Sequence, residues 1–297
     1  MKIPITFLGT AQAIPSAKRN HTSILLSYKD EKILIDCGEG TQRQFRKAKI
    51  NPCKLTRILI SHWHGDHILG IPGLLQTLAL NNYSKTLHIY GPRGTKKYLG
   101  LMYQLFVHIG KLKVEAHEVT GKFLETPDFY IEAFEMKHGA PCLAYSFIEK
   151  NKLRLKKDKL KKLKLQGRII AELAAGKDIT WQGKKIRSSD ITYSQPGRKI
   201  TVIMDTALNP NTIKAAKDAD LLISESTYTQ EEADKAREYK HMTAKDAAEI
   251  AKKAKVKQLI LTHLSQRYEN RESIILKEAK KVFRQTKIAE DLMTIEI

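Results

Sequence analysis

Three histidines and an aspartate fall within six residues of the sequence, in the order His62, His64, Asp66 and His67. Zinc binds imidazole nitrogen and carboxylate oxygen at about 2.0–2.2 Å, so its ligands must converge closely. Gly65 gives the backbone the freedom that such a tight turn requires. Burying these polar side chains without partners would be costly. We therefore predict that this turn holds metal ions.

Three more candidate ligands, His138, Asp205 and His263, each follow a short run of mostly apolar residues. Taken singly, His138 and His263 could equally be structural histidines, but with the histidine-rich turn they complete a two-metal set in which Asp205 bridges the ions. Two zinc ions about 3.5–4 Å apart can share and acidify a water molecule and bind a phosphate. Asp66 could both ligate and accept the proton from that water. Manganese and iron accept the same oxygen and nitrogen donors, so zinc is favoured without excluding them.

Several short apolar runs end in polar residues that could carry chemistry, which is typical of buried strands in a layered α/β protein. These runs are 33–35, 58–60, 201–204, 221–223 and 259–261. Between them, Thr243 and Asp246 resemble a capping box and predict a helix that runs to about Ala254. A second helix is predicted over about 271–283 by its apolar and basic periodicity.

A chain of 297 residues can form one large domain or two small ones, and either can bury a substantial core. We interpret 1–297 as a single domain. No run of about 18 apolar residues occurs, so no transmembrane helix and no membrane partner are expected. The three cysteines show no CxxC spacing, which favours a reducing, cytoplasmic location.

The chain carries 52 Lys and Arg against 32 Asp and Glu, a formal net charge of +20. Such a field attracts polyanions, although a lysine-rich solvated surface would give the same number. Between Lys150 and Arg168, ten basic residues face one acidic residue, Asp158. We interpret 151–190 as an arm inserted into the domain; by itself the stretch could equally be a solvated helix and hairpin.

Together these motifs resemble the short form of the tRNase Z family, within the metallo-β-lactamase superfamily. Besides the HxHxDH turn, the resemblance rests on segments 7–10, 36–42, 224–228, 241–244 and 261–268. The segment Asp-Cys-Gly-Glu-Gly-Thr-Gln at 36–42 is far more specific to the family than the turn. The resemblance implies an αββα sandwich with a dinuclear metal site at one edge.

The resemblance also implies the ligand sets and the reaction. His62, His64, His138 and Asp205 would hold one zinc, and Asp66, His67, Asp205 and His263 the other, giving two zinc ions per subunit. Enzymes of this family remove the 3′ trailer of precursor tRNA by cutting after the discriminator base, which leaves a 3′-hydroxyl. The family further implies a homodimer whose inserted arm grips the tRNA body.

Cleavage also requires a proton for the leaving oxygen, and His241 is the candidate acid. It precedes the predicted helix at Thr243, whose N-terminus would lower an imidazole pKa, so a carboxylate partner is needed. Glu225 is the partner that the family motif suggests. Candidate RNA contacts are the loop that the family uses to sense CCA and the basic arm: Arg19, Asn20, Lys156, Lys157, Lys161 and Lys162.

Two other functions compete with this one. A phosphodiesterase or arylsulfatase of the same fold, acting on small-molecule esters, would keep the metal site and need no arm. An RNA-binding module with one structural zinc would lack catalysis, but the number of ligands and the bridging Asp205 argue against it.

Overall fold

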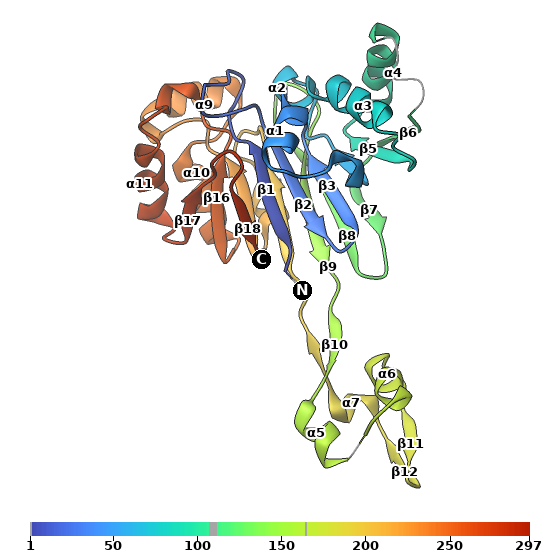
Figure 1. Ribbon diagram of the computed structural model, residues 1–297. Helices are drawn as coiled ribbons and strands as arrows, with labels where there is room; N and C mark the ends of the chain where they lie inside the picture. Colours follow the sequence, from blue (N-terminus) through green and yellow to red (C-terminus); the bar gives the residue numbers. More distant parts are fainter. Residues whose placement is uncertain (1, 107–111, 164) are drawn as a thin grey trace. The chain divides into compact units, whose positions relative to one another are not determined.

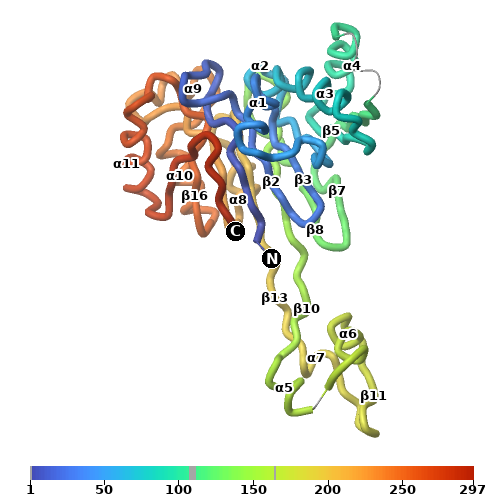
Figure 2. Tube along the Cα trace, in the orientation of Figure 1, coloured from blue at the N-terminus to red at the C-terminus, as the bar shows by residue number. Residues whose placement is uncertain are grey.

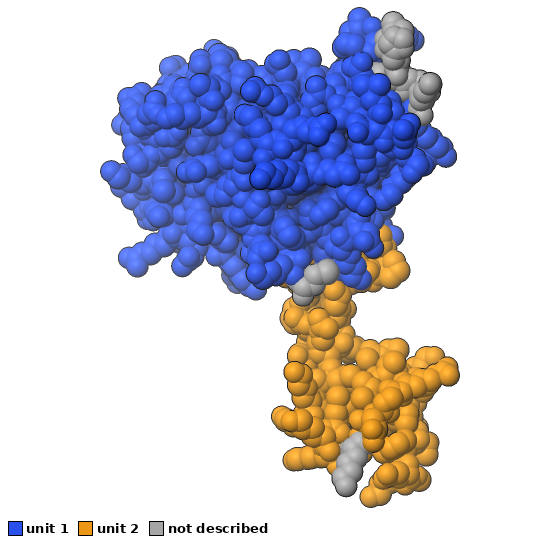
Figure 3. All heavy atoms as spheres, in the orientation of Figure 1, with its two compact units in different colours: residues 1–125, 131–147, 199–297 blue, residues 126–130, 148–198 orange. Residues whose placement is uncertain are grey.

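The computed structural model describes residues 2–106, 112–163 and 165–297. These residues form two compact units (Figure 3), and each is described by itself. The first unit comprises Met1–Glu125, Ile131–Phe147 and Lys199–Ile297, and the second comprises Thr126–Tyr130 and Ile148–Arg198.

Two seven-stranded sheets form the centre of the first unit, as far as the described residues show (Figure 1). In spatial order, the first sheet contains β18 (Thr294–Glu296), β1 (Pro4–Gly9), β2 (Ser23–Tyr28), β3 (Glu31–Ile35), β4 (Arg57–Leu59), β5 (Leu87–Gly91) and β6 (Val114–Glu118). The second contains β17 (Thr286–Ile288), β16 (Gln258–Thr262), β15 (Leu221–Glu225), β14 (Lys199–Ile203), β9 (Cys142–Glu149), β8 (Phe129–Met136) and β7 (Gly121–Glu125). Because β1 pairs with β18, the two chain ends lie close together (Figure 2).

Helices cover the outer face of each sheet. They are α1 (Thr41–Lys47), α2 (Gly65–Ile68), α3 (Ile71–Leu80), α4 (Thr95–Leu105), α8 (Pro210–Ala216), α9 (Ala233–Tyr239), α10 (Ala244–Lys253) and α11 (Ser273–Val282), with 3-10 turns η1 (Pro52–Lys54), η3 (Gln230–Glu232) and η4 (Gln266–Tyr268). Phe45 of α1 and Leu74 of α3 join the core of the first sheet, and Ala247 of α10 joins that of the second. Between the sheets, the Tyr145 hydroxyl donates to the Ile60 carbonyl at 2.7 Å. The layered α/β prediction is confirmed.

Local sequence signals set the helix that follows the candidate acid. Thr243 is the N-cap of α10; its hydroxyl accepts from the Asp246 amide at 3.1 Å, and the Asp246 carboxylate accepts from the Thr243 amide at 3.0 Å. This reciprocal pair satisfies two amides that the helix would otherwise leave unbonded. The predicted capping box is therefore confirmed, and α10 ends within one residue of the predicted Ala254.

Parallel pairing brings the functional segments to one edge. Strand β3 runs parallel to β4, and β14, β15 and β16 are parallel to one another. Their carboxyl ends therefore meet at a common edge within each sheet, where ligands of α/β proteins usually bind.

The second unit has its own small core. Its elements are β10 (Lys152–Leu155), α5 (Lys157–Lys162), α6 (Arg168–Ala174), β11 (Ile179–Trp181), β12 (Lys184–Ile186), α7 (Ser188–Ile191) and β13 (Thr192–Gln195). Strand β10 pairs with β13, and β11 pairs with β12. The side chains of Leu165, Leu173, Ile179, Ile186 and Ile191 are buried together. Residues 151–190, the predicted arm, lie within this unit.

Within the described ranges, no helix combines the length and the apolar character that crossing a bilayer would require.

Candidate active site

The structure brings all seven predicted metal ligands together. In one group, the ligand atoms of His62, His64, His138 and Asp205 lie within 4.8 Å of one another. In a second group, those of Asp66, His67, Asp205 and His263 meet the same limit. Asp205 belongs to both groups, which is the position of a bridging ligand.

Each ligand lies at or just beyond the end of a secondary structure element. His62 follows β4, His138 follows β8, Asp205 follows β14 and His263 follows β16, while Asp66 and His67 belong to the short helix α2. His263 has a φ of 57°, in the left-handed region that non-glycine residues seldom adopt. Such strain is commonly retained where a side chain must be aimed at a functional centre.

Ring nitrogens of different histidines lie close together at the centre. Two such nitrogens repel each other through their lone pairs unless a proton or a metal ion lies between them. His67 Nε2 lies 3.2 Å from His263 Nε2, and His138 Nε2 lies 3.2 Å from His64 Nδ1. Asp205 Oδ1 lies 3.1 Å from His263 Nε2. Tetrahedral zinc ligands at about 2.0–2.2 Å from the ion are themselves about 3.3–3.6 Å apart. The spacing therefore fits divalent cations between these atoms.

In four of the five ligand histidines, the ring nitrogen Nδ1 contacts another protein group. These contacts are His67 Nδ1 with Asp36 at 2.7 Å, His62 Nδ1 with the Ser61 hydroxyl at 3.0 Å, His263 Nδ1 with the Thr227 hydroxyl at 3.0 Å, and His138 Nδ1 with the Lys240 carbonyl at 3.1 Å. Contacts of this kind fix ring orientation and leave the opposite nitrogen available to a metal. Nε2 of each of these four rings therefore faces the centre, whereas His64 presents Nδ1 to His138.

Two buried atoms have no hydrogen-bond partner among the described residues at this centre, His62 Nε2 and Asp205 Oδ1. Leaving a buried polar atom unbonded costs about 1–3 kcal/mol. A cation between the two groups would satisfy both atoms at once. The residues present therefore fit a pair of metal ions.

The surroundings of His62 and Asp66 favour the protonation states that ligate metals. Burial, followed by the proximity of His67, lowers the pKa of His62 well below its usual value, so its imidazole is neutral. Burial alone would raise the pKa of Asp66, but His67 and His263 outweigh it and hold that pKa below its usual range. Neutral imidazole and ionised carboxylate are the forms that bind zinc. At His67 burial lowers the pKa, but Asp205, Asp36 and Asp66 outweigh it and raise the pKa well above its usual value, so a metal ion would have to displace a proton there.

The predicted contact between His241 and Glu225 is present in the structure. His241 Nδ1 lies 3.1 Å from Oε2 and 3.2 Å from Oε1 of Glu225, whose side chain is buried. His241 Nε2 faces the metal centre, 3.9 Å from Asp205. Burial lowers the pKa of His241, but the negative charges of Glu225 and Asp205 raise it by more. The net result is a pKa of about 9. Without bound cations, the ring is therefore an imidazolium at neutral pH.

Asp36, Ser61 and Thr227 were not among the predicted site residues. Asp36 is fully buried, has a φ of 56°, and accepts hydrogen bonds from the Ser61 amide at 2.7 Å and from its hydroxyl at 2.8 Å. Thr227 donates to Glu225 Oε2 at 2.7 Å and lies 3.0 Å from His263 Nδ1, so it links the acid pair to a ligand. The available signal was that Asp36 and Thr227 lie in the segments 36–42 and 224–228 and that Ser61 directly precedes His62. The sequence did not tell which imidazole each of them would support.

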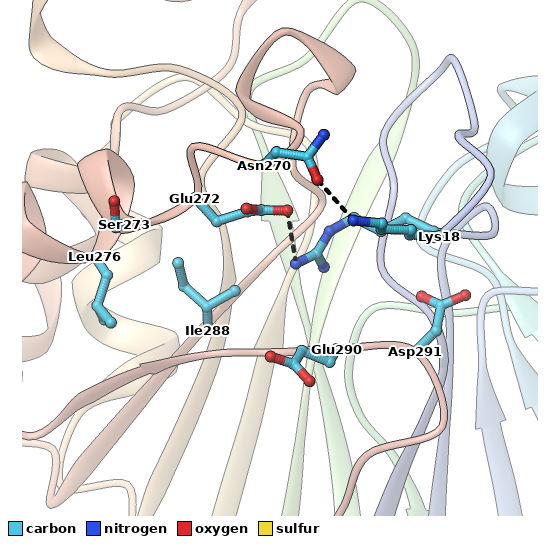
Figure 4. Close-up of a pocket in the computed structure, with 9 residues that line it drawn as sticks. Lys18, Asn270, Glu272, Ser273, Leu276, Ile288, Glu290 and Asp291 are labelled. Atoms are coloured by element: carbon cyan, nitrogen blue, oxygen red, sulfur yellow. Dashed lines mark hydrogen bonds and ion pairs between the residues drawn. The ribbon is translucent and has the colours of Figure 1, made fainter.

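The loop that carries two of the predicted RNA contacts is held by internal bonds. Arg19 donates to the Thr10 hydroxyl and to the Ala289 carbonyl, both at 2.7 Å, and Asn20 donates to the Glu39 carbonyl at 2.6 Å. Beside this loop is a pocket of about 540 Å³, in which Lys18 bonds Asn270 at 2.6 Å (Figure 4). Contact of Arg19 and Asn20 with RNA stays a prediction.

The four predicted arm lysines lie on or just before α5 in the second unit. Lys157, Lys161 and Lys162 are exposed, whereas Lys156 is half-buried, with its ammonium 3.4 Å from the Asp190 carbonyl. The exposed three are therefore the more accessible to a polyanion, and their contact with RNA also stays a prediction.

Similarity to known proteins establishes the family to which this chain belongs. Over 296 residues the chain is 42% identical to ribonuclease Z of Methanothermobacter thermautotrophicus, an alignment that covers 99% of this chain and 96% of that protein. The chain belongs to the ribonuclease Z family. Ribonuclease Z of Archaeoglobus fulgidus is 37% identical over 310 residues, which cover 100% of this chain and 98% of that protein.

Solved structures agree with this family assignment. The crystal structure of human tRNase Z, short form, matches with a TM-score of 0.71 and 28% identity, covering 98% of both chains. The metallo-β-lactamase fold protein YhfI of Bacillus subtilis matches with a TM-score of 0.71 at 22% identity, covering 100% of this chain and 99% of that one, and therefore speaks for the fold alone. The predicted metallo-β-lactamase sandwich is confirmed, and this family member is a hydrolase with a metal-binding centre.

A family model described as anti-Pycsar protein Apyc1 matches residues 3–104. That segment includes the turn with His62 and His67 but ends before His138, Asp205 and His263. It covers only about a third of the chain, whereas the ribonuclease Z relatives span nearly all of it.

Proposed function

We propose that the protein is a zinc-dependent endoribonuclease that removes the 3′ trailer of precursor tRNA. It cuts after the discriminator base and leaves a 3′-hydroxyl on the tRNA and a 5′-phosphate on the trailer. The observation that carries this proposal is the position of Glu225 and His241, which place a buried acid pair beside two ligand groups sharing Asp205. Metal ions assist attack on a phosphodiester, and an acid protonates its leaving oxygen, so the two parts together suit this hydrolysis.

Two zinc ions per subunit, when bound, supply Lewis-acid stabilisation of the phosphate and lower the pKa of a coordinated water. The ligand groups that meet at Asp205 would hold them. Asp66 contributes one carboxylate oxygen, Oδ2, 3.2 Å from His67 Nε2 and 3.3 Å from His263 Nε2. Its pKa is held low, so its carboxylate is ionised. Its position at the centre is what would let it accept the proton that the attacking water loses.

His241 supplies the proton to the leaving 3′-oxygen of the tRNA. Its Nδ1 is held by Glu225, so the Nε2 proton is directed toward the centre where the phosphate would bind. Glu225 keeps the imidazole charged, which it must be to act as an acid. Thr227 in turn holds Glu225 in place through a hydrogen bond.

Binding of the RNA is assigned to the second unit. Its 56 residues carry 15 Lys and Arg against 6 Asp and Glu, a net +9 of the chain's +20. A strongly basic segment with its own core can present fixed positive charge to phosphates. The homodimer implied by the family is part of this proposal.

The direct test incubates the zinc-loaded protein with a precursor tRNA that has a defined 3′ extension, and maps the new end to one nucleotide. We expect one cut, after the discriminator base, and a 3′-hydroxyl product. The His64→Ala variant, checked for folding by circular dichroism, should bind less zinc and leave the RNA intact.

Intact RNA together with hydrolysis of a small diester such as bis-p-nitrophenyl phosphate would contradict the proposal in favour of the small-ester alternative. Cleavage at several unrelated positions would likewise contradict tRNA 3′ processing.

A further inference from the structure

A second group of histidine and carboxylate side chains lies on β5 and β6 of the first sheet. The ligand atoms of His88, Glu115 and His117 all lie within 4.8 Å of one another. This group shares no residue with the candidate active site. All three side chains are partly exposed, so an ion can reach them from solution.

The distances within this group suit a tetrahedral ion. His88 Nδ1 lies 3.2 Å from His117 Nε2 and 3.5 Å from Glu115 Oε2. Two ligands of a tetrahedral zinc are about 3.3–3.6 Å apart when each is about 2.0–2.2 Å from the ion. The distance from His88 to Glu115 falls in this range and the distance from His88 to His117 lies just below it. A bound zinc would therefore need little movement of the side chains.

The sheet and its neighbours hold these side chains in place. Strands β5 and β6 are parallel, with His88 beside Glu115 and Tyr90 beside His117 in the register. The Tyr90 ring stacks on that of His117, with centroids 4.7 Å apart and planes at 20°. The Tyr90 ring also packs against Phe123 of β7, with centroids 5.0 Å apart. Ligands on strands with packed rings lose little further freedom when an ion binds.

This group lies away from the catalytic edge of the sheet. His88 is paired with Arg57 at the start of β4, whereas His62 and the rest of the catalytic turn follow the end of β4 at Leu59. Strand β6 is an edge strand, hydrogen-bonded only to β5 among the described strands. An ion here would join the edge strand to its neighbour by side-chain bonds in addition to the backbone ladder.

Two lysines already lie near this group, Lys96 beside His117 and Lys113 beside Glu115. Lys113 Nζ is 3.5 Å from Glu115 Oε1, while Oε2 is the oxygen that faces His88. The carboxylate can therefore serve both partners, although the ammonium competes with a metal for its charge.

We propose that His88, His117 and Glu115 bind one divalent ion of the zinc, nickel or copper class, separate from the catalytic centre. Two imidazoles and one carboxylate leave a fourth position for water, and this donor set suits these ions. The ion would stabilise the edge of the sheet and take no part in catalysis.

The test is equilibrium dialysis of the full chain against rising free Zn²⁺, with bound zinc counted by mass spectrometry. The double variant His88→Gln/His117→Gln should bind one zinc fewer per chain than the wild type, with unchanged cleavage of precursor tRNA. The difference of one ion is independent of how many ions the catalytic centre holds. Equal zinc content in the two proteins, with the variant folded by circular dichroism, would overturn the proposal.

Two single variants keep the test valid if the double variant does not fold. Glu115→Gln removes a charged ligand and should weaken binding of this one zinc at least about tenfold. Lys113→Gln removes the competing cation and should strengthen it. If neither substitution changes the affinity of any zinc, the proposal is wrong.

Discussion

At the scale of single residues, the metal centre depends on side chains that stand behind the ligands. Asp36 accepts two hydrogen bonds from Ser61 and contacts His67 at 2.7 Å. One buried carboxylate therefore holds both the start of the catalytic turn, at Ser61, and its last ligand, His67. A carboxylate behind a ligating histidine both fixes the ring and raises its basicity. The site therefore extends beyond its seven candidate ligands.

Replacing Asp36 by Asn should weaken zinc binding about 10- to 100-fold, because an uncharged amide of the same shape orients His67 less well and no longer raises its basicity. Competition with a chromophoric chelator measures this affinity. Zinc affinity equal to that of the wild type would show that Asp36 serves the fold alone.

The acid pair makes a separate prediction. His241→Ala should lower the cleavage rate about 10²- to 10⁴-fold while zinc content and tRNA affinity are retained. Adding Glu225→Gln to that variant should cause little further loss, because the two residues act as a unit. Loss of zinc from His241→Ala would instead show that this histidine is a ligand.

The pH dependence of Glu225→Gln follows from the sign of the pKa shift. Glu225 raises the pKa of His241, and an acid stays protonated until the pH exceeds its pKa. Without the carboxylate, the pKa falls and the proton is lost at lower pH. The alkaline limb of the pH–rate profile of this variant should therefore lie at lower pH than that of the wild type, and an unmoved limb would assign that limb to another group.

At the scale of elements, the sequence predicted what depends on local pattern. Apolar runs located β3, β4, β14, β15 and β16, and the capping box located α10, because strand burial and helix capping are read within a few residues. The catalytic turn, Asp205 and His263 follow β4, β14 and β16, so the sequence could indicate that these candidate ligands gather at one edge. The side chains that support the ligands could not be predicted. Asp36 is 31 residues from His67, and Thr227 is 36 residues from His263, so these pairs meet only when the chain folds.

The histidines on β5 and β6 illustrate the same limit. His88 and His117 had no role in the sequence interpretation, since they are 29 residues apart and follow no recognisable motif. Only the register of two parallel strands places them on one face. The small core of the second unit, which includes Leu165 and Ile186, was also missed because its apolar residues are scattered among lysines.

The capping box of α10 gives a stability prediction. Thr243→Ala removes the hydroxyl that accepts from the Asp246 amide and donates to the Asp246 carboxylate. It should lower the free energy of unfolding by about 1 kcal/mol, whereas Thr243→Ser should retain most of that stability. Urea unfolding followed by circular dichroism measures both. Equal stability of the Ala and Ser variants would mean that the cap contributes nothing here.

The basic helix α5 gives a prediction about substrate binding. Replacing Lys157, Lys161 and Lys162 by Ala should raise KM for precursor tRNA and flatten its dependence on salt, because fewer counterions are released from the RNA. Hydrolysis of bis-p-nitrophenyl phosphate should be unaffected. The matched control replaces three exposed lysines of α11, Lys277, Lys280 and Lys281, and so changes the charge equally. Equal effects of the two triple variants would mean that overall charge matters and α5 does not.

At the scale of the whole molecule, one unit holds the candidate chemistry and the other holds a large share of the charge. The first unit places ligands from both sheets, 196 residues apart for His67 and His263, around one centre. The second unit contributes +9 of the net charge in less than a fifth of the chain. Metal chemistry alone would serve any phosphodiester, so the charge is what directs the proposed activity to RNA.

The central claim is that two ions occupy the space shared by the seven ligands. Diffraction from crystals of the zinc-loaded protein, recorded on both sides of the zinc absorption edge, tests it directly. We predict two strong anomalous peaks about 3.5–4 Å apart with Asp205 between them. No peak within coordination distance of Asp205, in crystals of protein that carries zinc, would contradict the account.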